Sequence, residues 1–413
     1  MLVPVLRSRR FLMMLAAILV GCGETTDVIG TRASTTTVET PSDDVLDTIG
    51  MTPEESEVAI RSAYEQLFFG DKDTQAVYFE DEDGDAGYIK NTQYGDVRTD
   101  AIGYGMFITV QLDEQEVFDK LWTWTKRYML ETEAPREGML RWSCTTKGTD
   151  CEPSAATDAT TVIATSLFIA EAAWAGTGVH DYANDANMLI DAMVLTEERN
   201  GGMVSDVRNL FDVAAKLPRN TSGASDGRAL LTDYLMPAFY DYWSKWRTED
   251  AEFWSEAAEA SRDLLRLAPV EGSGLIPVAI ASDGTPAGPD YWYDETSART
   301  LLNRWFCQSW MAPQSWVFVQ NRMLLDFLLE QEQLVSSYEL NGAIRGDINT
   351  VAHISLTATA AAASGDVETY ASFLETLADA PIPEGAGRYY QGMIYLISLL
   401  AVSGNIRAGT PAP

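Results

Sequence analysis

The chain has 413 residues and carries 29 Lys and Arg against 61 Asp and Glu, which gives a formal net charge of −32 at pH 7. This excess of negative charge argues against nucleic acid and anionic membrane surfaces as partners, whereas a neutral substrate is compatible with it. The length suits either two or three average domains or one large single-domain architecture.

The N-terminal segment is typical of an export signal. Several arginines precede "FLMMLAAILV", an apolar run of ten residues that is too short to span a bilayer. The following "LVGC" resembles a lipobox, so we expect residues 1–21 to be a lipoprotein signal peptide and Cys22 to be lipidated. The alternative is an ordinary secretory signal with an incidental cysteine. Residues 22–50 are expected to be a flexible tether, and the protein an exported, lipid-anchored bacterial lipoprotein on the outer membrane, periplasmic or surface face.

Residues 51–409 are dominated by apolar residues at the three- and four-residue spacing of amphipathic helices. In "EQEVFDKLWTWTKRYML", for example, Val117, Leu121 and Trp122 lie on one helical face. The pattern recurs about a dozen times, often followed by Gly or Pro. We expect one all-α domain of helical hairpins, arranged as a solenoid or a closed ring, and the very different loop lengths favour the ring.

Residues 77–90 predict a β-hairpin around an acidic turn that contains a glycine. Three aspartates at alternate positions, starting with Asp81, also invite a calcium interpretation. An EF-hand loop needs Gly at its sixth position and Glu at its twelfth, which here hold Ala86 and Thr92. A solvated turn is therefore the preferred interpretation, and no metal is expected.

Cys144 and Cys151 flank a six-residue loop, a spacing that a disulfide can close in an exported protein. The alternative is a pair of reduced thiols. Cys307 lies within an apolar helical pattern and is expected to be a buried thiol.

The sequence offers little for metal catalysis, because it has two histidines and neither an HExxH nor a CxxC motif. Carboxylates and aromatic residues are abundant, including 11 Trp and 17 Tyr. These residue types cleave glycosidic bonds and stack on sugar rings. We therefore expect a site that needs no cofactor.

Five segments carry more specific information, and they occur in this order: "RTDAIGYGM" with the helix after it, "SAATDATTVIATSLFIAEAAW", "SGLIPVAIASDGTP", "YWYDETSART" and "RYYQGMIYLISLLAVSGNIR". Together they resemble the signatures of glycoside hydrolase family 8, from about residue 55 to residue 407. The "DVRT" lead-in and the hairpin before it look most like the branch of xylanases and reducing-end xylose-releasing exo-oligoxylanases.

The resemblance implies an (α/α)6 barrel, in which six helical hairpins form a ring and the substrate groove crosses one end. It also implies hydrolysis of β-1,4-linked glycans with inversion. An inverting enzyme needs an acid and a base roughly 6.5–9.5 Å apart, so that a water molecule fits between the base and the sugar.

Asp100 falls on the position of the general acid, where the family has Glu. The alternative is that Asp100 only caps a helix starting near Ile102. Tyr104 falls on the family's active-site tyrosine. Arg98 is expected to bind a sugar hydroxyl or to hold Asp100 ionised.

Three further residues are expected to contact the substrate. Asp158 matches the aspartate that holds the distorted sugar in the family, with helix capping as the alternative. Trp122 is placed among the aromatic residues of the groove. His353 begins a segment that resembles a family helix near the groove, where a lining role and a structural role are both open.

The catalytic base is expected at Asp294 or Glu295. The common family pattern is Asp-x-x-Arg, and Arg299 falls on its arginine as a substrate-binding residue, but a threonine stands where the aspartate belongs. Two alternatives remain open. Asp283 or Asp290 in the preceding loop is one, and a purely capping role for "DETS" is the other.

These observations favour an inverting hydrolase of xylan or xylo-oligosaccharides that works as a monomer and touches the membrane only through its lipid. One alternative is a catalytically impaired glycan-binding surface lipoprotein on the same fold. Another is a β-1,4-glucanase or a chitosanase.

Overall fold

The computed structural model describes residues 44–223, 229–288 and 291–410, all within one compact unit that spans Glu39–Pro413. The predicted signal peptide, the lipidation site Cys22 and most of the predicted tether lie outside the described residues. None of the helices in the described part of the chain is long and apolar enough to cross a membrane.

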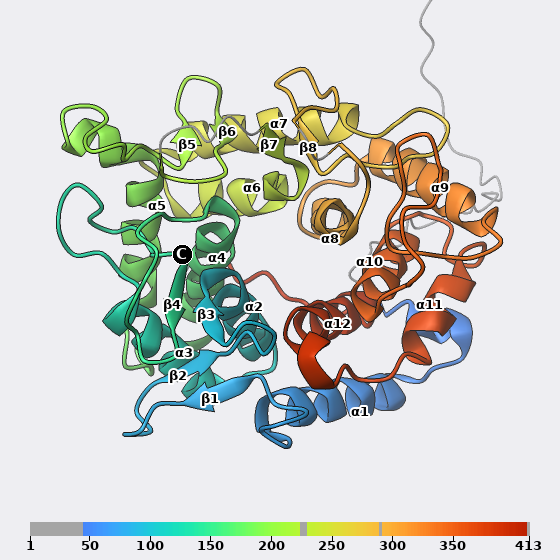
Figure 1. Ribbon diagram of the computed structural model, residues 1–413, viewed down its shortest axis with the longest axis horizontal. Helices are drawn as coiled ribbons and strands as arrows, with labels where there is room; N and C mark the ends of the chain where they lie inside the picture. Colours follow the sequence, from blue (N-terminus) through green and yellow to red (C-terminus); the bar gives the residue numbers. More distant parts are fainter. Residues whose placement is uncertain (1–43, 224–228, 289–290, 411–413) are drawn as a thin grey trace, which may run out of the picture. The chain divides into compact units, whose positions relative to one another are not determined.

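Six helices line the inside of a ring, and each of them contacts the next, with the last closing on the first (Figure 1). The inner helices are α2 (Thr99–Gln111), α4 (Thr157–Trp174), α6 (Pro237–Trp246), α8 (Glu295–Trp310), α10 (Val351–Ala362) and α12 (Arg388–Val402). The outer helices are α1 (Pro53–Tyr64), α3 (Gln115–Tyr128), α5 (Tyr182–Arg199), α7 (Ala251–Leu267), α9 (Ser315–Leu329) and α11 (Ala371–Ala378). This alternation confirms the predicted all-α (α/α)6 barrel.

The difference between inner and outer helices follows from the sequence. Helices α2, α4, α10 and α12 are apolar around most of their circumference and are buried along most of their length. Helices α3 and α7 bury one face only and present charged residues on the other. A helix that is apolar all round has to lie in a core, whereas an amphipathic helix covers it. Burial of these faces therefore assigns each helix to its layer.

The short strands form four antiparallel pairs among the described residues. They are β1 (Tyr78–Glu80) with β2 (Gly87–Ile89), β3 (Asp96–Arg98) with β4 (Ser143–Thr145), β5 (Phe211–Asp212) with β6 (Leu217–Pro218), and β7 (Leu230–Leu231) with β8 (Ala279–Ile280). The β1–β2 pair confirms the hairpin predicted over 77–90. The other three pairs were not predicted. The turn between β5 and β6 contains no glycine, and the partners in the other two pairs lie far apart in the sequence.

The acidic turn of the β1–β2 hairpin forms ion pairs with the side chain of Arg127. Arg127 donates to Asp81 at 2.9 Å and to Asp85 at 2.8 Å. This surface ion pair fits the interpretation of a turn in solvent.

Four short helical segments complete the described fold: η1 (Leu46–Ile49), the π-turn η2 (Glu65–Phe69), η3 (Thr232–Tyr234) and η4 (Gly385–Gly387). The first of them shifts the domain boundary. Leu46 is buried, and the backbone N–H of Val45 donates to the carbonyl of Val402 at 3.0 Å. The packed domain therefore begins before residue 51, inside the stretch predicted as tether.

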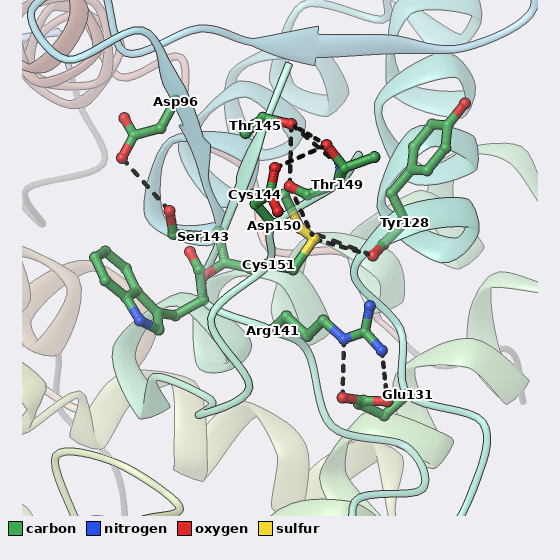
Figure 2. The surroundings of a disulfide bond; sticks show 12 residues. Asp96, Tyr128, Glu131, Arg141, Ser143, Cys144, Thr145, Thr149, Asp150 and Cys151 are labelled. Carbon is green, nitrogen blue, oxygen red and sulfur yellow. Dashed lines mark hydrogen bonds and ion pairs between the residues drawn. A yellow bond between two sulfur atoms is a disulfide. The ribbon is translucent and has the colours of Figure 1, made fainter. Parts of the chain in front are cut away.

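Cys144 and Cys151 form a disulfide bond close to Tyr128 (Figure 2). Cys144 lies on β4 opposite Val97 of β3, and its neighbour Ser143 lies opposite Arg98. Since β3 leads directly into α2, the disulfide closes the loop behind the strand that positions the start of α2. Cys307 is a buried free thiol.

Candidate active site

The N-terminal ends of the inner helices meet through a set of buried polar contacts. Contacts between side chains join α2 to α8 and α12, and α8 to α4, η3 and Thr350, the residue before α10. Carboxylates at the start of a helix are stabilised by its unpaired N–H groups and its dipole. This end of the ring therefore collects acidic residues at fixed positions, as a catalytic site for sugars requires.

Asp100 lies in the first turn of α2, which begins at Thr99 and has Arg98 as its N-cap residue. The alternative of a cap for a helix starting near Ile102 is therefore wrong. Its Oδ1 accepts from the backbone N–H of Ala101 at 2.8 Å and from the Tyr389 hydroxyl at 2.9 Å. Within the described residues Oδ2 accepts no hydrogen bond. Asp100 is thus held by one oxygen and has the other available.

Arg98 does not pair with Asp100. Its Nε donates to Asp96 Oδ2 at 2.9 Å, and its guanidinium lies 5.2 Å from the ring centre of Tyr94 and 5.3 Å from that of Trp142. Arg98 therefore makes its ion pair with Asp96, and its proposed contact with a sugar hydroxyl stays a prediction. Trp142 was not predicted as a site residue, although a half-buried ring beside the start of α2 is suited to stack on a sugar.

Arg299 of α8 contacts two predicted site residues, Tyr104 and Asp158, and one residue that was not predicted, Asp233. Its Nη1 donates to the Tyr104 hydroxyl at 3.1 Å and lies 3.5 Å from Asp158 Oδ2. Its Nη2 pairs with Asp233 Oδ2. The adjacent carboxylates hold the pKa of Arg299 above its ordinary value, although burial opposes this. The guanidinium therefore remains charged and connects α2, α4 and η3.

Asp158 is the second residue of α4 and is 6% exposed. The N-cap of α4 is Ala156, so Asp158 does not cap the helix. Its Oδ1 is buried without a hydrogen-bond donor among the described residues. Burial raises its pKa, and the charge of Arg299 opposes the rise. A buried acceptor without a donor is costly unless a ligand supplies one, which suits a group that receives a sugar hydroxyl.

Asp233 is the residue of this cluster that sequence reasoning missed. It lies in η3, is 1% exposed, and burial raises its pKa to about 7. The available signal was a single acid within the apolar run "LLTDYLMPAF". Acidic residues in apolar surroundings are paired or functional far more often than idle.

The two predicted base residues stand in different environments. Asp294 is the N-cap of α8, where Oδ1 accepts from Thr296 N at 2.8 Å and Oδ2 from Trp292 Nε1 at 2.8 Å. Glu295 Oε1 accepts from the Thr350 hydroxyl, while Oε2 accepts no hydrogen bond within the described residues. Burial raises the pKa of Glu295.

Of the two alternative base residues in the preceding loop, Asp283 does not join this cluster. Asp283 is exposed in a turn and accepts from the backbone N–H and hydroxyl of Thr285. Asp290 lies outside the described residues.

Two of the residues that were predicted to bind substrate are instead buried against other side chains. Trp122 is fully buried, and its Nε1 donates to Asp185 Oδ2 at 2.6 Å, so it fills the interface between α3 and α5. His353 is 1% exposed. Its Nε2 pairs with the Tyr293 hydroxyl at 2.9 Å and its Nδ1 with Asn349 Oδ1 at 2.7 Å. Burial lowers the pKa of His353 to about 4, and its role is structural.

A cavity at the inner helix ends is bordered by Tyr104, Asp233 and Arg299. A separate open groove of about 620 Å³ contains none of these residues. It is lined in part by Val351 and Gln391, which directly follow Thr350 and Tyr390 in the sequence. The side chain of Thr350 and the hydroxyl of Tyr390 both contact Glu295.

A family model for "Glycosyl hydrolases family 8" matches residues 84–404. The chain belongs to this family. The chain is thus a family 8 glycosidase, and the fold seen in Figure 1 is the family's (α/α)6 barrel.

Family 8 members with curated names and solved structures are similar to this chain over nearly its whole length. It is 30% identical over 372 residues to the reducing end xylose-releasing exo-oligoxylanase of Halalkalibacterium halodurans, covering 88% of this chain and 93% of that one. It is 31% identical over 372 residues to Rex8A of Paenibacillus barcinonensis, a reducing-end xylose-releasing exo-oligoxylanase, covering 87% and 94%. A xylobiose complex of a family 8 protein from Teredinibacter turnerae superposes with a TM-score of 0.83 at 30% identity, covering 89% and 98%. This family 8 glycosidase is therefore related to enzymes that cleave xylo-oligosaccharides.

Proposed function

We propose that this family 8 glycosidase hydrolyses β-1,4-linked xylan or xylo-oligosaccharides with inversion at the anomeric carbon. The observation that carries the proposal is the convergence of Asp100, Tyr104 and Asp158 at the starts of α2 and α4. The likeness to xylo-oligosaccharide-cleaving relatives over nearly their whole length supports the choice of xylan.

Asp100 is proposed as the general acid. One carboxyl oxygen is fixed by Ala101 and Tyr389, so the side chain is oriented before substrate binds. The other oxygen is available to give a proton to the leaving oxygen, which needs contact at about 2.6–3.2 Å. Asp158 and Tyr104, joined through Arg299, are proposed to hold the sugar next to the cleaved bond.

Glu295 is proposed as the general base in preference to Asp294. A base must accept a proton from the attacking water through an oxygen that is not already committed. Glu295 retains one such oxygen, whereas Asp294 uses one for its helix cap and the other for Trp292.

The same region supports a second candidate function. If the capping role of Asp294 is its only role and Glu295 does not reach the water, the site lacks a base. The protein would then bind glycan chains without cleaving them.

Incubation of the full-length protein with xylohexaose, cellohexaose and chitosan hexamer separates these candidates. We expect xylo-oligosaccharide products from xylohexaose alone. Products from cellohexaose or the chitosan hexamer would instead favour a glucanase or a chitosanase. Binding of xylohexaose without cleavage would favour the glycan-binding protein.

We also propose that the protein is exported and anchored through a lipid on Cys22. The Cys144–Cys151 disulfide supports export, because such bonds persist in oxidising compartments. Fractionation of the producing cells provides the test. We expect the unchanged protein in the membrane fraction and the Cys22→Ser variant outside it. The same distribution of both proteins between the fractions would contradict the lipid anchor.

A further inference from the structure

Asp158 and Asp233 share a single cation. Both carboxylates are buried, and both lie against the guanidinium of Arg299, one on each terminal nitrogen. Neither oxygen of Asp233 accepts a conventional hydrogen bond from another described residue. A buried carboxylate needs a partner to offset its desolvation, so Asp233 depends on Arg299.

Arg299 in turn depends on Asp233 for its orientation. A guanidinium next to a lone carboxylate prefers to bind both of its oxygens with two parallel N–H groups. Here the contact to Asp158 is a single one at 3.5 Å, because the second terminal nitrogen is taken by Asp233. Asp158 Oδ1 forms no hydrogen bond of normal geometry within the described residues, although the Tyr234 hydroxyl lies close to the same carboxylate.

We propose that Asp233 is a positioning residue, which holds one arm of Arg299 so that Asp158 keeps an oxygen free for a sugar hydroxyl. Asp233 borders a cavity together with Tyr104 and Arg299 but is only 1% exposed, and we assign it no contact of its own with the sugar. The inference rests on the proposed function, in which Asp158 binds the sugar.

The charged and titratable groups around Asp233 make this arrangement dependent on pH. The groups that face it are Arg299 of α8, Asp294 just before α8, Asp158 of α4, Tyr390 of α12 and Tyr234 of its own segment. Burial raises the pKa of Asp233 to about 7, above its ordinary value. Asp233 is therefore neutral below this pH and ionised above it, so its hold on Arg299 is present at high pH and lost at low pH.

The variant that tests the inference is Asp233→Asn, which keeps the shape of the side chain and removes its charge. It is compared in an Asp100→Asn background, so that xylohexaose binds without being cleaved. The matched control is Asn303→Ala. Asn303 donates to the backbone carbonyls of Asp233 and Leu235 at 2.9 and 3.1 Å, so its loss disturbs the same segment without touching the carboxylate.

Calorimetry would give the dissociation constant for xylohexaose at about pH 5.5 and about pH 8.5, on either side of the pKa of Asp233. At the higher pH we expect Asp233→Asn to weaken binding roughly tenfold. At the lower pH the two proteins should bind alike. Asn303→Ala should lower the melting temperature and leave the pH dependence of binding unchanged.

Equal affinity of Asp233→Asn and its parent at the higher pH would overturn the inference, and so would a loss of the same size at both pH values. If Asp233→Asn does not fold, the affinity of the Asp100→Asn parent at the two pH values provides the test. The same affinity at both pH values would overturn the inference. Failure of the parent to bind xylohexaose, cellohexaose and chitosan hexamer would overturn the proposed function as well.

Discussion

The two sides of the candidate site use their carboxylates differently. On the side of α2 and α4, Asp100 and Asp158 are each held through one oxygen and keep the other without a donor among the described residues. At the start of α8, Asp294 uses both oxygens to cap the helix and to bind Trp292. Asp100 and Asp158 are thus available for chemistry because neither of them is the N-cap of its helix, whereas Asp294 is the N-cap of α8. Four predictions test this contrast.

Asp100→Asn should have the largest effect. Asparagine keeps the hydrogen bond to Tyr389 but has no acidic proton to give, so we expect kcat to fall roughly 10²–10⁴-fold. The measurement is xylohexaose turnover, with Asp85→Asn in the exposed β1–β2 turn as the control that keeps full activity. Normal turnover by Asp100→Asn would show that the acid lies elsewhere.

Arg299→Gln should mainly lower stability. It leaves Asp158 and Asp233 buried without a cation, so we expect the free energy of unfolding to fall by about 3–5 kcal/mol. The matched control is Arg98→Gln, whose pair with Asp96 is more exposed and should cost about 0–1 kcal/mol. Denaturant unfolding measures both, and equal losses would mean that the Arg299 cluster is not the central support of the site.

Glu295→Gln and Asp294→Asn should separate the two base residues. Asparagine caps a helix nearly as well as aspartate but cannot also accept from Trp292, so Asp294→Asn should lower stability and change kcat only a few-fold. Loss of a general base should lower kcat of Glu295→Gln by about 10²-fold or more. The reverse order in turnover measurements would assign the base to Asp294 despite its cap.

The double variant Cys144→Ser, Cys151→Ser should have the smallest effect. In the chain-entropy model, opening so short a loop costs about 2.5 kcal/mol of unfolding free energy. We expect the unfolding midpoint to drop, because β4 pairs with β3, which leads into α2. At low temperature, where the protein stays folded, kcat should change little. An unchanged midpoint would show that the bond adds no stability.

The helical ring could be predicted because its signal is long and repeated. Apolar spacing in α3 and small, apolar composition in α10 each persist over several turns. Asp100, Tyr104, Asp158 and Arg299 could be located by resemblance, since each lies within a quoted motif. Three-residue strands and the boundary at Leu46 gave no comparable periodic signal.

Other parts of the site depend on tertiary contacts that a linear pattern does not contain. Trp122 belongs to an aromatic stripe that serves α5 rather than the groove, and His353 turns both nitrogens to neighbours. Asp233 comes close to Arg299 only because η3 packs beside α8. Which carboxylate lies free and which one caps is decided by those partners.

The most direct test of the central claim is proton NMR of the products formed from xylohexaose in the first minutes of reaction. An inverting site with Asp100 as acid predicts that the new reducing ends appear as the α-anomer, followed by slow mutarotation. Initial β-anomer would contradict inversion, and absence of cleavage would contradict the assignment of the protein as an active hydrolase.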